Sequence, residues 1–223
     1  MLCGRICSCQ GYGFGLKQTV IQILQKEERE MKWIGFYDYT VILTYIGLIS
    51  GIMGMKCAFA GNLAAAIGCL VFSGICDMFD GAIARTKKNR TADEKNFGIQ
   101  IDSLCDVICF GVFPAVYLYF SGMDTLFGVA ILAIYVLCAV IRLAFFNVLE
   151  INRQRQEDGC AKSFRGLPVT SAAILFPLLY LVGLAVNGNA MLVVHHIAAF
   201  LMGVLFIADF SIPKLDIAKL FKR

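Results

Sequence analysis

The sequence predicts an all-α integral membrane protein with six transmembrane helices and with both termini in the cytosol. Apolar residues make up 59% of the 223 residues and charged residues 16%, a composition that excludes the water-facing surface of a soluble globule. Five segments lack Asp, Glu, Lys and Arg altogether: 39–55, 57–76, 107–123, 125–141 and 166–208. About 20 helical residues cross the roughly 30 Å of hydrocarbon in a bilayer. The last segment is long enough to cross twice, turning at Asn187-Gly188-Asn189, which gives six spans.

The chain divides into a membrane domain and two flanking segments. Residues 1–34 are expected to form an amphipathic arm in the cytosol or along the membrane surface, because charges interrupt every apolar run that a signal peptide would need. The cysteines of this arm, Cys3, Cys7 and Cys9, are expected to be free thiols rather than zinc ligands. Residues 35–211 form the predicted membrane domain, and 212–223 a short basic tail.

The placement of the basic residues predicts the orientation. If the spans alternate, the turns near Lys56, Asp124 and Asn187 share one side, and Lys56 is the only basic residue there. The other basic residues lie at the termini and in the loops 85–97 and 142–165. By the positive-inside rule these parts face the cytosol. Because topology and anionic lipid headgroups account for the basic loops, nucleic acid is not expected as a partner.

Four acidic residues lie at the ends of predicted spans rather than in loops. Asp77 and Asp80 directly follow the second span, and Asp102 and Asp106 fall at the start of the third. Spacings of three and four residues place each pair on one helical face. Because these spans are antiparallel neighbours, we expect all four carboxylates to converge just inside the cytosolic face. Ionisable groups within spans are costly and by default indicate function.

Such a cluster points to metal-dependent phosphate chemistry. Four carboxylates in a low-dielectric setting repel one another and require a cation. Ligands that are all oxygen favour hard cations such as Mg²⁺ or Mn²⁺, and a pair of these ions stabilises displacement at phosphorus. Gly81 allows a ligand to approach the backbone, Ala84 keeps the next turn clear, and Arg85 offers a planar fork for a phosphate. The alternative is that the acids merely pair with Arg85, Lys87 and Lys88 at the helix ends.

These residues form the pattern Asp77-x2-Asp80-Gly81-x2-Ala84-Arg85, twelve residues, then Gly98-x3-Asp102-x3-Asp106. This pattern resembles the signature of the CDP-alcohol phosphatidyltransferase family, and the resemblance extends over most of 38–215. It implies a six-helix membrane enzyme, usually a homodimer, that uses a CDP-linked lipid. By the same resemblance Asp77, Asp80, Asp102 and Asp106 bind one or two divalent ions, and Asp106 is the general base. The implied contacts to CDP are Asp77, Asp80, Gly81, Ala84, Arg85 and, from the first span, Thr44.

Further segments resemble the phosphatidylserine synthase branch of that family. They are FGIQIDSLCDVICFGVFPA at 97–115, IRLAFFN at 141–147 and FRGLP at 164–168. The resemblance implies that the hydroxyl of L-serine displaces CMP from CDP-diacylglycerol, giving phosphatidylserine.

The carboxylate of serine needs a cation in its pocket. Arg142 and Arg165 are the candidates, with Asn147 and Ser103 as weaker ones. The alternative for both arginines is that they anchor the cytosolic helix ends.

Two other functions remain open from the residues. The same chemistry could use glycerol 3-phosphate, inositol or an inositol phosphate as acceptor. A divalent-cation transporter also carries intramembrane carboxylates, although it would place them near the bilayer midplane at broken helices.

Overall fold

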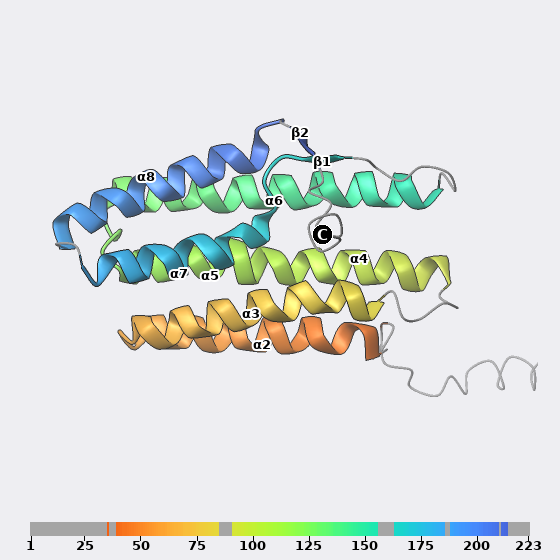
Figure 1. The fold of residues 1–223 in the computed structure, drawn as a ribbon, viewed down its shortest axis with the longest axis horizontal. Coiled ribbons are helices and arrows are strands. Elements are labelled where there is room, and N and C mark those ends of the chain that lie inside the picture. Colours follow the sequence, from red (N-terminus) through yellow and green to blue (C-terminus); the bar gives the residue numbers. More distant parts are fainter. Residues whose placement is uncertain are drawn as a thin grey trace, which may run out of the picture. The chain divides into compact units, whose positions relative to one another are not determined.

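The computed structural model describes residues 35, 39–84, 91–155, 163–185, 188–209 and 211–213, and all of its helices belong to one unit, Tyr37–Arg223. The helices α2 (Tyr39–Phe59) and α3 (Leu63–Ala84) form an antiparallel pair. A continuous helical run follows: α4 (Ala92–Asp106), the π-helix η1 (Val107–Val112) and α5 (Phe113–Phe120). The chain continues through α6 (Leu126–Arg155), the 3₁₀-helix η2 (Val169–Ser171), α7 (Ala172–Gly183) and α8 (Gly188–Ile207). In Figure 1 the α4–α5 run lies between the α2–α3 pair and the α6–α8 pair.

The prediction of a helical membrane protein is confirmed, but the count of six spans is not. Five helical segments are long and apolar enough to cross a bilayer: Val41–Phe59, Leu63–Ile83, Ala92–Phe120, Leu126–Asn152 and Gly188–Ile207. The remaining apolar helix, Val169–Gly183, is shorter. Its two parts, η2 and α7, contain 3 and 12 residues and together rise about 22 Å. The helix starts late because Pro168 has an extended backbone, with φ −67° and ψ 142°.

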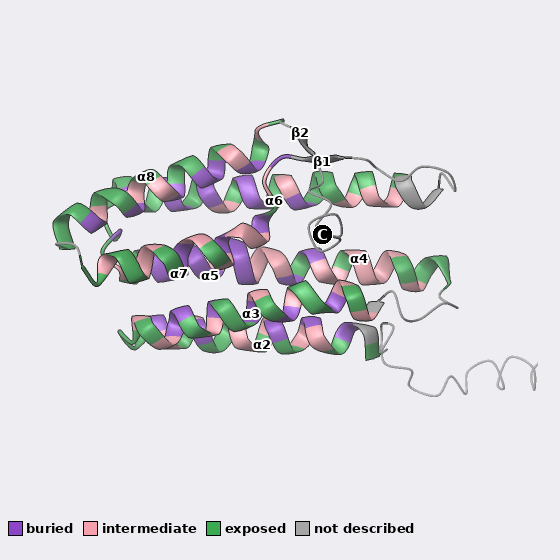
Figure 2. Ribbon diagram, viewed as in Figure 1, coloured by how far each residue is buried: buried purple, intermediate pink, exposed green. Residues whose placement is uncertain are grey.

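The burial pattern is that of a bundle with an apolar exterior. Large apolar side chains cover the outside, among them Leu126 at 89% and Ile174 at 73% exposure. The fully buried side chains include Tyr135, Phe110 and Phe113. Figure 2 shows buried and exposed positions alternating along the helices. An exposed surface this apolar is compatible with lipid contact rather than with water.

Small residues allow α2 to approach its neighbours closely. A Cβ atom on Gly54 would lie 2.2 Å from the Cζ atom of Phe113, and one on Gly51 would lie 3.1 Å from the Sγ atom of Cys109. At both positions glycine leaves room for a side chain of the neighbouring helical run, and small residues at helix contacts are characteristic of packing within membranes. The contact places α2 against the segment that follows Asp106.

The third membrane helix begins earlier than predicted. Thr91 and Glu94 form a capping box: the Thr91 N–H donates to Glu94 Oε2 at 2.8 Å, and the Glu94 N–H donates to Thr91 Oγ1 at 3.2 Å. Helix α4 therefore starts at Ala92, and Asp102 lies well inside it rather than at its start. The uncharged segment 107–123 therefore covers only the C-terminal part of the helical run Ala92–Phe120.

A short β pairing departs from the predicted all-α fold. Strands β1 (Ser163–Arg165) and β2 (Ser211–Pro213) are antiparallel, with Ser163 opposite Pro213 and Arg165 opposite Ser211. The pairing brings the segment before α7 beside the segment after α8. The predicted arm 1–34, Cys3, Cys7 and Cys9, and residues 214–223 of the predicted tail lie outside the described residues.

Candidate active site

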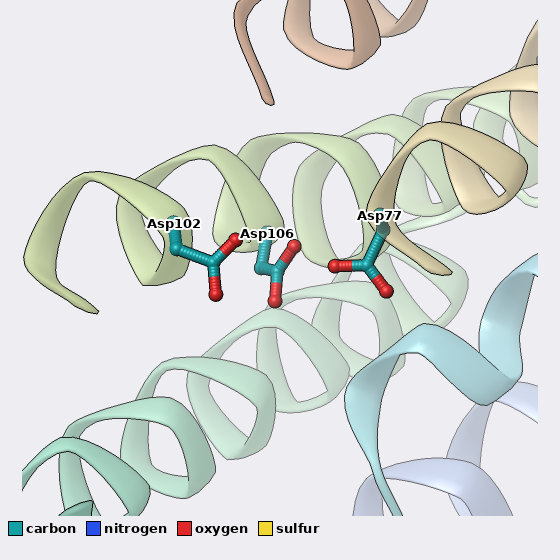
Figure 3. Close-up of side chains that lie close together, drawn as sticks. All are labelled: Asp77, Asp102 and Asp106. Atoms are coloured by element: carbon teal, nitrogen blue, oxygen red, sulfur yellow. The ribbon is translucent and has the colours of Figure 1, made fainter. Parts of the chain in front are cut away.

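Three of the four predicted carboxylates meet in one group. Asp77 comes from α3, and Asp102 and Asp106 lie one turn apart on α4, so that each offers an oxygen within 4.8 Å of the others. Figure 3 shows the three carboxylates side by side, with that of Asp77 directed toward Asp106. All three residues are partly buried. The spacing of the two acidic pairs thus correctly predicted that α3 and α4 would bring their carboxylates together.

Asp80 lies beside this group rather than within it. Its side chain is 6% exposed, and its Oδ2 atom accepts a hydrogen bond of 2.8 Å from Thr44 Oγ1 of α2. On its other side the Asp80 carboxyl group adjoins that of Asp102. Helix α2 therefore supplies a donor that fixes one of the four acids. The predicted contact of Thr44 with CDP stays a prediction, because its described partner is Asp80.

A small pocket adjoins the carboxylates between α2, α3 and the α4–η1 run. Its lining residues are Thr44, Gly47, Ser73, Asp77, Asp80, Cys105, Asp106, Cys109 and Phe110. Two groups of the pocket already bind backbone: Ser73 Oγ donates to Gly47 O at 3.1 Å, and Cys109 Sγ to the same atom at 3.6 Å. The cysteines described inside the spans are free thiols, and most are buried. The carboxylates are thus the ionisable oxygens of this pocket.

The donor set fits a hard divalent cation. Three carboxylates from α3 and α4 can place several oxygens around one point, and oxygen ligands favour Mg²⁺, Mn²⁺ or Ca²⁺ over softer ions. Grouping three anionic side chains inside an apolar bundle without a cation would be costly. The group could therefore hold a metal ion.

The residues after Asp80 are described only in part. Gly81 lies half-buried in the last turn of α3, and Ala84 ends that helix. The side chain of Ala84 and the whole of Arg85 lie outside the described residues, so their predicted contacts to CDP stay predictions.

Two of the predicted serine-binding residues bind each other. Ser103 Oγ donates to Asn147 Oδ1 at 2.6 Å, and Asn147 Nδ2 donates to Gln100 Oε1 at 3.4 Å. These bonds join α4 to α6 through Ser103 and Gln100, one and two residues from Asp102. They hold the acid-bearing face of α4 in register with α6.

Arg142 lies on α6 beside a second, larger pocket. Its Nε donates to Leu167 O at 3.3 Å. The pocket measures about 240 Å³, and its lining residues are Ile141, Arg142, Phe145, Gly166, Phe206, Ile207, Ala208 and Asp209. Arg165 lies in β1, and its side chain is outside the described residues. Asp209 was missed by the sequence reasoning, because nothing in the sequence places the residue after α8 next to α6.

The register of α6 places Arg142 near the depth of Asp106. Along this antiparallel contact, Asn147 meets Ser103, and Ala139 lies opposite Gly111, where an added Cβ would be 3.5 Å from the Ala139 Cβ. Arg142 falls between these two contacts on α6, and Asp106 falls between the same contacts on the facing run. The larger pocket therefore flanks α6 at the level of the carboxylates.

Comparison with known proteins identifies a family and several relatives. Residues 40–208 match the family model described as CDP-alcohol phosphatidyltransferase. Archaetidylserine synthase of Methanothermobacter thermautotrophicus is 31% identical over 191 residues, which cover 84% of this chain and 74% of the relative. CDP-diacylglycerol–serine O-phosphatidyltransferase of Methanocaldococcus jannaschii is 32% identical over 183 residues, covering 82% and 76%, and that of Helicobacter pylori (strain 26695) is 33% identical over 144 residues, covering 64% and 56%.

No solved structure shows a significant match to the chain. The family match spans every residue of the acidic group and both pockets except Asp209. On the motif, the site and this match, the chain belongs to the CDP-alcohol phosphatidyltransferase family.

Proposed function

We propose that this protein transfers the phosphatidyl group of CDP-diacylglycerol to L-serine, giving phosphatidylserine and CMP. The observation that carries the proposal is the meeting of Asp77, Asp102 and Asp106 within 4.8 Å inside a membrane helix bundle. The family match supports the transfer of a phosphatidyl group, and the names of the relatives support serine as the acceptor.

In this proposal the four aspartates bind one or two divalent ions, Mg²⁺ or Mn²⁺. The hydrogen bond from Thr44 orients the carboxylate of Asp80 for this role. A divalent ion bound there would neutralise charge on the pyrophosphate of the CDP-lipid. Gly81, Ala84, Arg85 and Thr44 would surround the CDP group. Asp106 would accept the proton of the serine hydroxyl while the hydroxyl oxygen bonds to the phosphorus that carries diacylglycerol. The bond from that phosphorus to the bridging oxygen breaks, and CMP leaves with the electron pair.

The charges of the larger pocket suit an amino-acid acceptor. A guanidinium at Arg142 would bind the serine carboxylate, with Arg165 as the other candidate, and the carboxylate of Asp209 in the same pocket would bind the ammonium group. An acidic side chain in the pocket disfavours glycerol 3-phosphate and inositol phosphates, because it would repel their phosphate. Asn147 and Ser103 would support this pocket through the bond that joins α6 to α4.

An acceptor panel tests the proposal. Purified protein with CDP-diacylglycerol and Mg²⁺ or Mn²⁺ should release CMP with L-serine, and much more slowly with ethanolamine, glycerol 3-phosphate or inositol. EDTA should abolish the release, and added Mn²⁺ should restore it. Equal rates with glycerol 3-phosphate would reject serine, and full activity in EDTA would reject the metal. Because one relative is named for archaetidylserine, a CDP-linked archaeal lipid belongs in the panel as a second donor.

Two substitutions test the acceptor pocket. Arg142→Ala should raise the KM for serine by about tenfold or more, since a desolvated charge-assisted bond is worth at least 1.4 kcal/mol. Asp209→Asn should raise the same KM and leave the KM for CDP-diacylglycerol near wild type. Asp124→Asn is the matched control, because this exposed acid lies in the turn before α6, remote from both pockets. A wild-type KM for serine in both Arg142→Ala and Asp209→Asn would reject the pocket.

We further propose that the bundle crosses the membrane six times, with the termini and the acidic group at the cytosolic face, and that it functions as a homodimer. The β1–β2 pairing supports the even number of crossings, because it brings both ends of the α7–α8 segment together. The position of Lys56 as the only basic residue of its side supports the orientation. The homodimer rests on the family resemblance.

A further inference from the structure

We infer that Tyr135 is a positioning residue for Asp106, acting through the π-helix that follows Asp106. The inference rests on the role proposed for Asp106. The observation behind it is a hydrogen bond of 2.6 Å, which Tyr135 Oη of α6 donates to Phe110 O in the middle of η1. Neither Tyr135 nor Phe110 belongs to the Asp77–Asp106 pattern, although Phe110 lies in the segment 97–115 that resembles the phosphatidylserine synthase branch.

The π-helix has a cause in the sequence. In a regular α-helix the Phe110 carbonyl would accept from the N–H of residue 114, but residue 114 is a proline, which has none and whose ring collides with that carbonyl. The run widens here instead, and the Phe113 N–H donates to Ile108 O, five residues back. Wide turns of this kind are frequent at functional sites. Pro114 therefore opens the helix directly after Asp106.

Tyr135 supplies the donor that proline cannot. Its side chain is 0% exposed, and its ring packs against those of Phe176 and Phe206, with centroids 6.0 and 5.5 Å away. The Phe110 side chain is 1% exposed. Because water is excluded around both residues, the Tyr135 hydroxyl has a fixed place and the Phe110 carbonyl has a dedicated donor. The bond fixes one side of η1 to α6.

The opposite side of η1 is fixed to α2. Cys109 Sγ donates to Gly47 O at 3.6 Å, and Gly51 packs against the same cysteine. Asp106 immediately precedes η1 with helical backbone angles, φ −62° and ψ −40°. A return of η1 to a regular α-helix would turn the residues before it by about 100° relative to those after it. The Asp106 carboxylate would then lose its place beside Asp77, and the wide turn therefore sets the geometry of the acidic group.

The first test removes the hydroxyl. Tyr135→Phe should lower kcat for CMP release about ten- to a hundredfold, the usual loss when a reacting group is displaced by about 1 Å. The KM for serine should stay near wild type, and the affinity for Mn²⁺, followed by electron paramagnetic resonance of the free ion, should fall. Tyr117→Phe is the matched control: Tyr117 is a buried tyrosine on α5 that packs against His195, and its variant should keep wild-type kcat and Mn²⁺ binding.

A second variant separates positioning from stability. In the double variant Pro114→Ala/Tyr135→Phe, residue 114 regains an N–H for Phe110 O, so the midpoint of thermal unfolding in detergent should return toward wild type. The wide turn is then no longer required, and kcat and Mn²⁺ affinity should stay low. Recovery of activity together with stability would reduce Tyr135 to a structural role, and wild-type kcat and Mn²⁺ binding in Tyr135→Phe would refute the inference.

The same comparison separates this inference from the proposed function. If the wild-type protein used another acceptor in place of serine, the serine assignment would fail. The kcat values of the variants would then be measured with that acceptor in place of serine, because Tyr135 acts on Asp106 and not on the acceptor pocket.

Discussion

At the scale of single residues, one substitution can separate the two roles proposed for Asp106, metal ligand and general base. Its carboxylate belongs to the acidic group and adjoins that of Asp77. Asp106→Asn keeps the shape of the side chain but cannot accept the proton of the acceptor hydroxyl, so turnover should fall by about 10²–10⁴-fold. Binding of CDP-diacylglycerol, measured as the shift it causes in the unfolding temperature, should stay nearly intact. Equal losses of binding and turnover would assign Asp106 chiefly to the metal, and Asp124→Asn should change neither.

The meeting of three acidic residues was predictable from the sequence, but some of the contacts around the acidic residues were not. Spacing along two neighbouring helices was enough to bring Asp77, Asp102 and Asp106 together, because helical periodicity fixes which side chains share a face. The partner of Asp80 could not be predicted, since it depends on how α2 is rotated about its axis. The rotation brings Thr44 to Asp80 at 2.8 Å.

At the scale of elements, the tight packing of α2 predicts a sharp difference between two glycines. A Cβ on Gly54 would lie 2.2 Å from Phe113 and 2.9 Å from the Cβ of Cys69, whereas a Cβ on Gly68 of α3 would meet nothing within 4 Å. Gly54→Ala should lower the free energy of unfolding by about 1–3 kcal/mol through overpacking. Gly68→Ala should be neutral or stabilising, because alanine is the better helix former. Thermal unfolding in detergent compares the two, and equal midpoints would contradict the packing of α2 against α5.

The sequence contains the signals for the element boundaries that were predicted wrongly. Thr91 and Glu94 have the spacing of a capping box and mark the early start of α4, but the prediction relied on the segment without charges. Pro114 is the sequence signal for the π-helix, but a proline inside a helix can equally produce an ordinary kink. The two outcomes differ in the hydrogen bond that Tyr135 of α6 donates to Phe110 O, and the local sequence does not reveal this bond. The β1–β2 pairing joins residues about fifty positions apart, which no local pattern indicates.

At the scale of the whole molecule, the hairpin that contains α7 and α8 determines on which side the chain ends. The paired strands place Arg165 opposite Ser211. The segment that enters α7 and the segment that follows α8 therefore lie at the same end of the two helices. In the proposed six-span topology α8 crosses the bilayer, and the segment from Gly166 to Gly183 crosses in the other direction despite its shorter helix. Its extended start at Pro168 adds length that a helix of the same residues would lack.

This topology predicts the side on which fused reporters will lie. Alkaline phosphatase, active only outside the cytosol, should be active when fused after Asp124 and inactive when fused after Arg223, while green fluorescent protein at the same positions should give the opposite pattern. If α7 did not cross, the chain would end on the same side as Asp124, and both phosphatase fusions would be active. If the whole bundle were inverted, only the fusion after Arg223 would be active. The basic residues favour the first outcome, because nineteen of the twenty then lie on the cytosolic side, where they can contact anionic headgroups and the phosphates of the CDP-lipid.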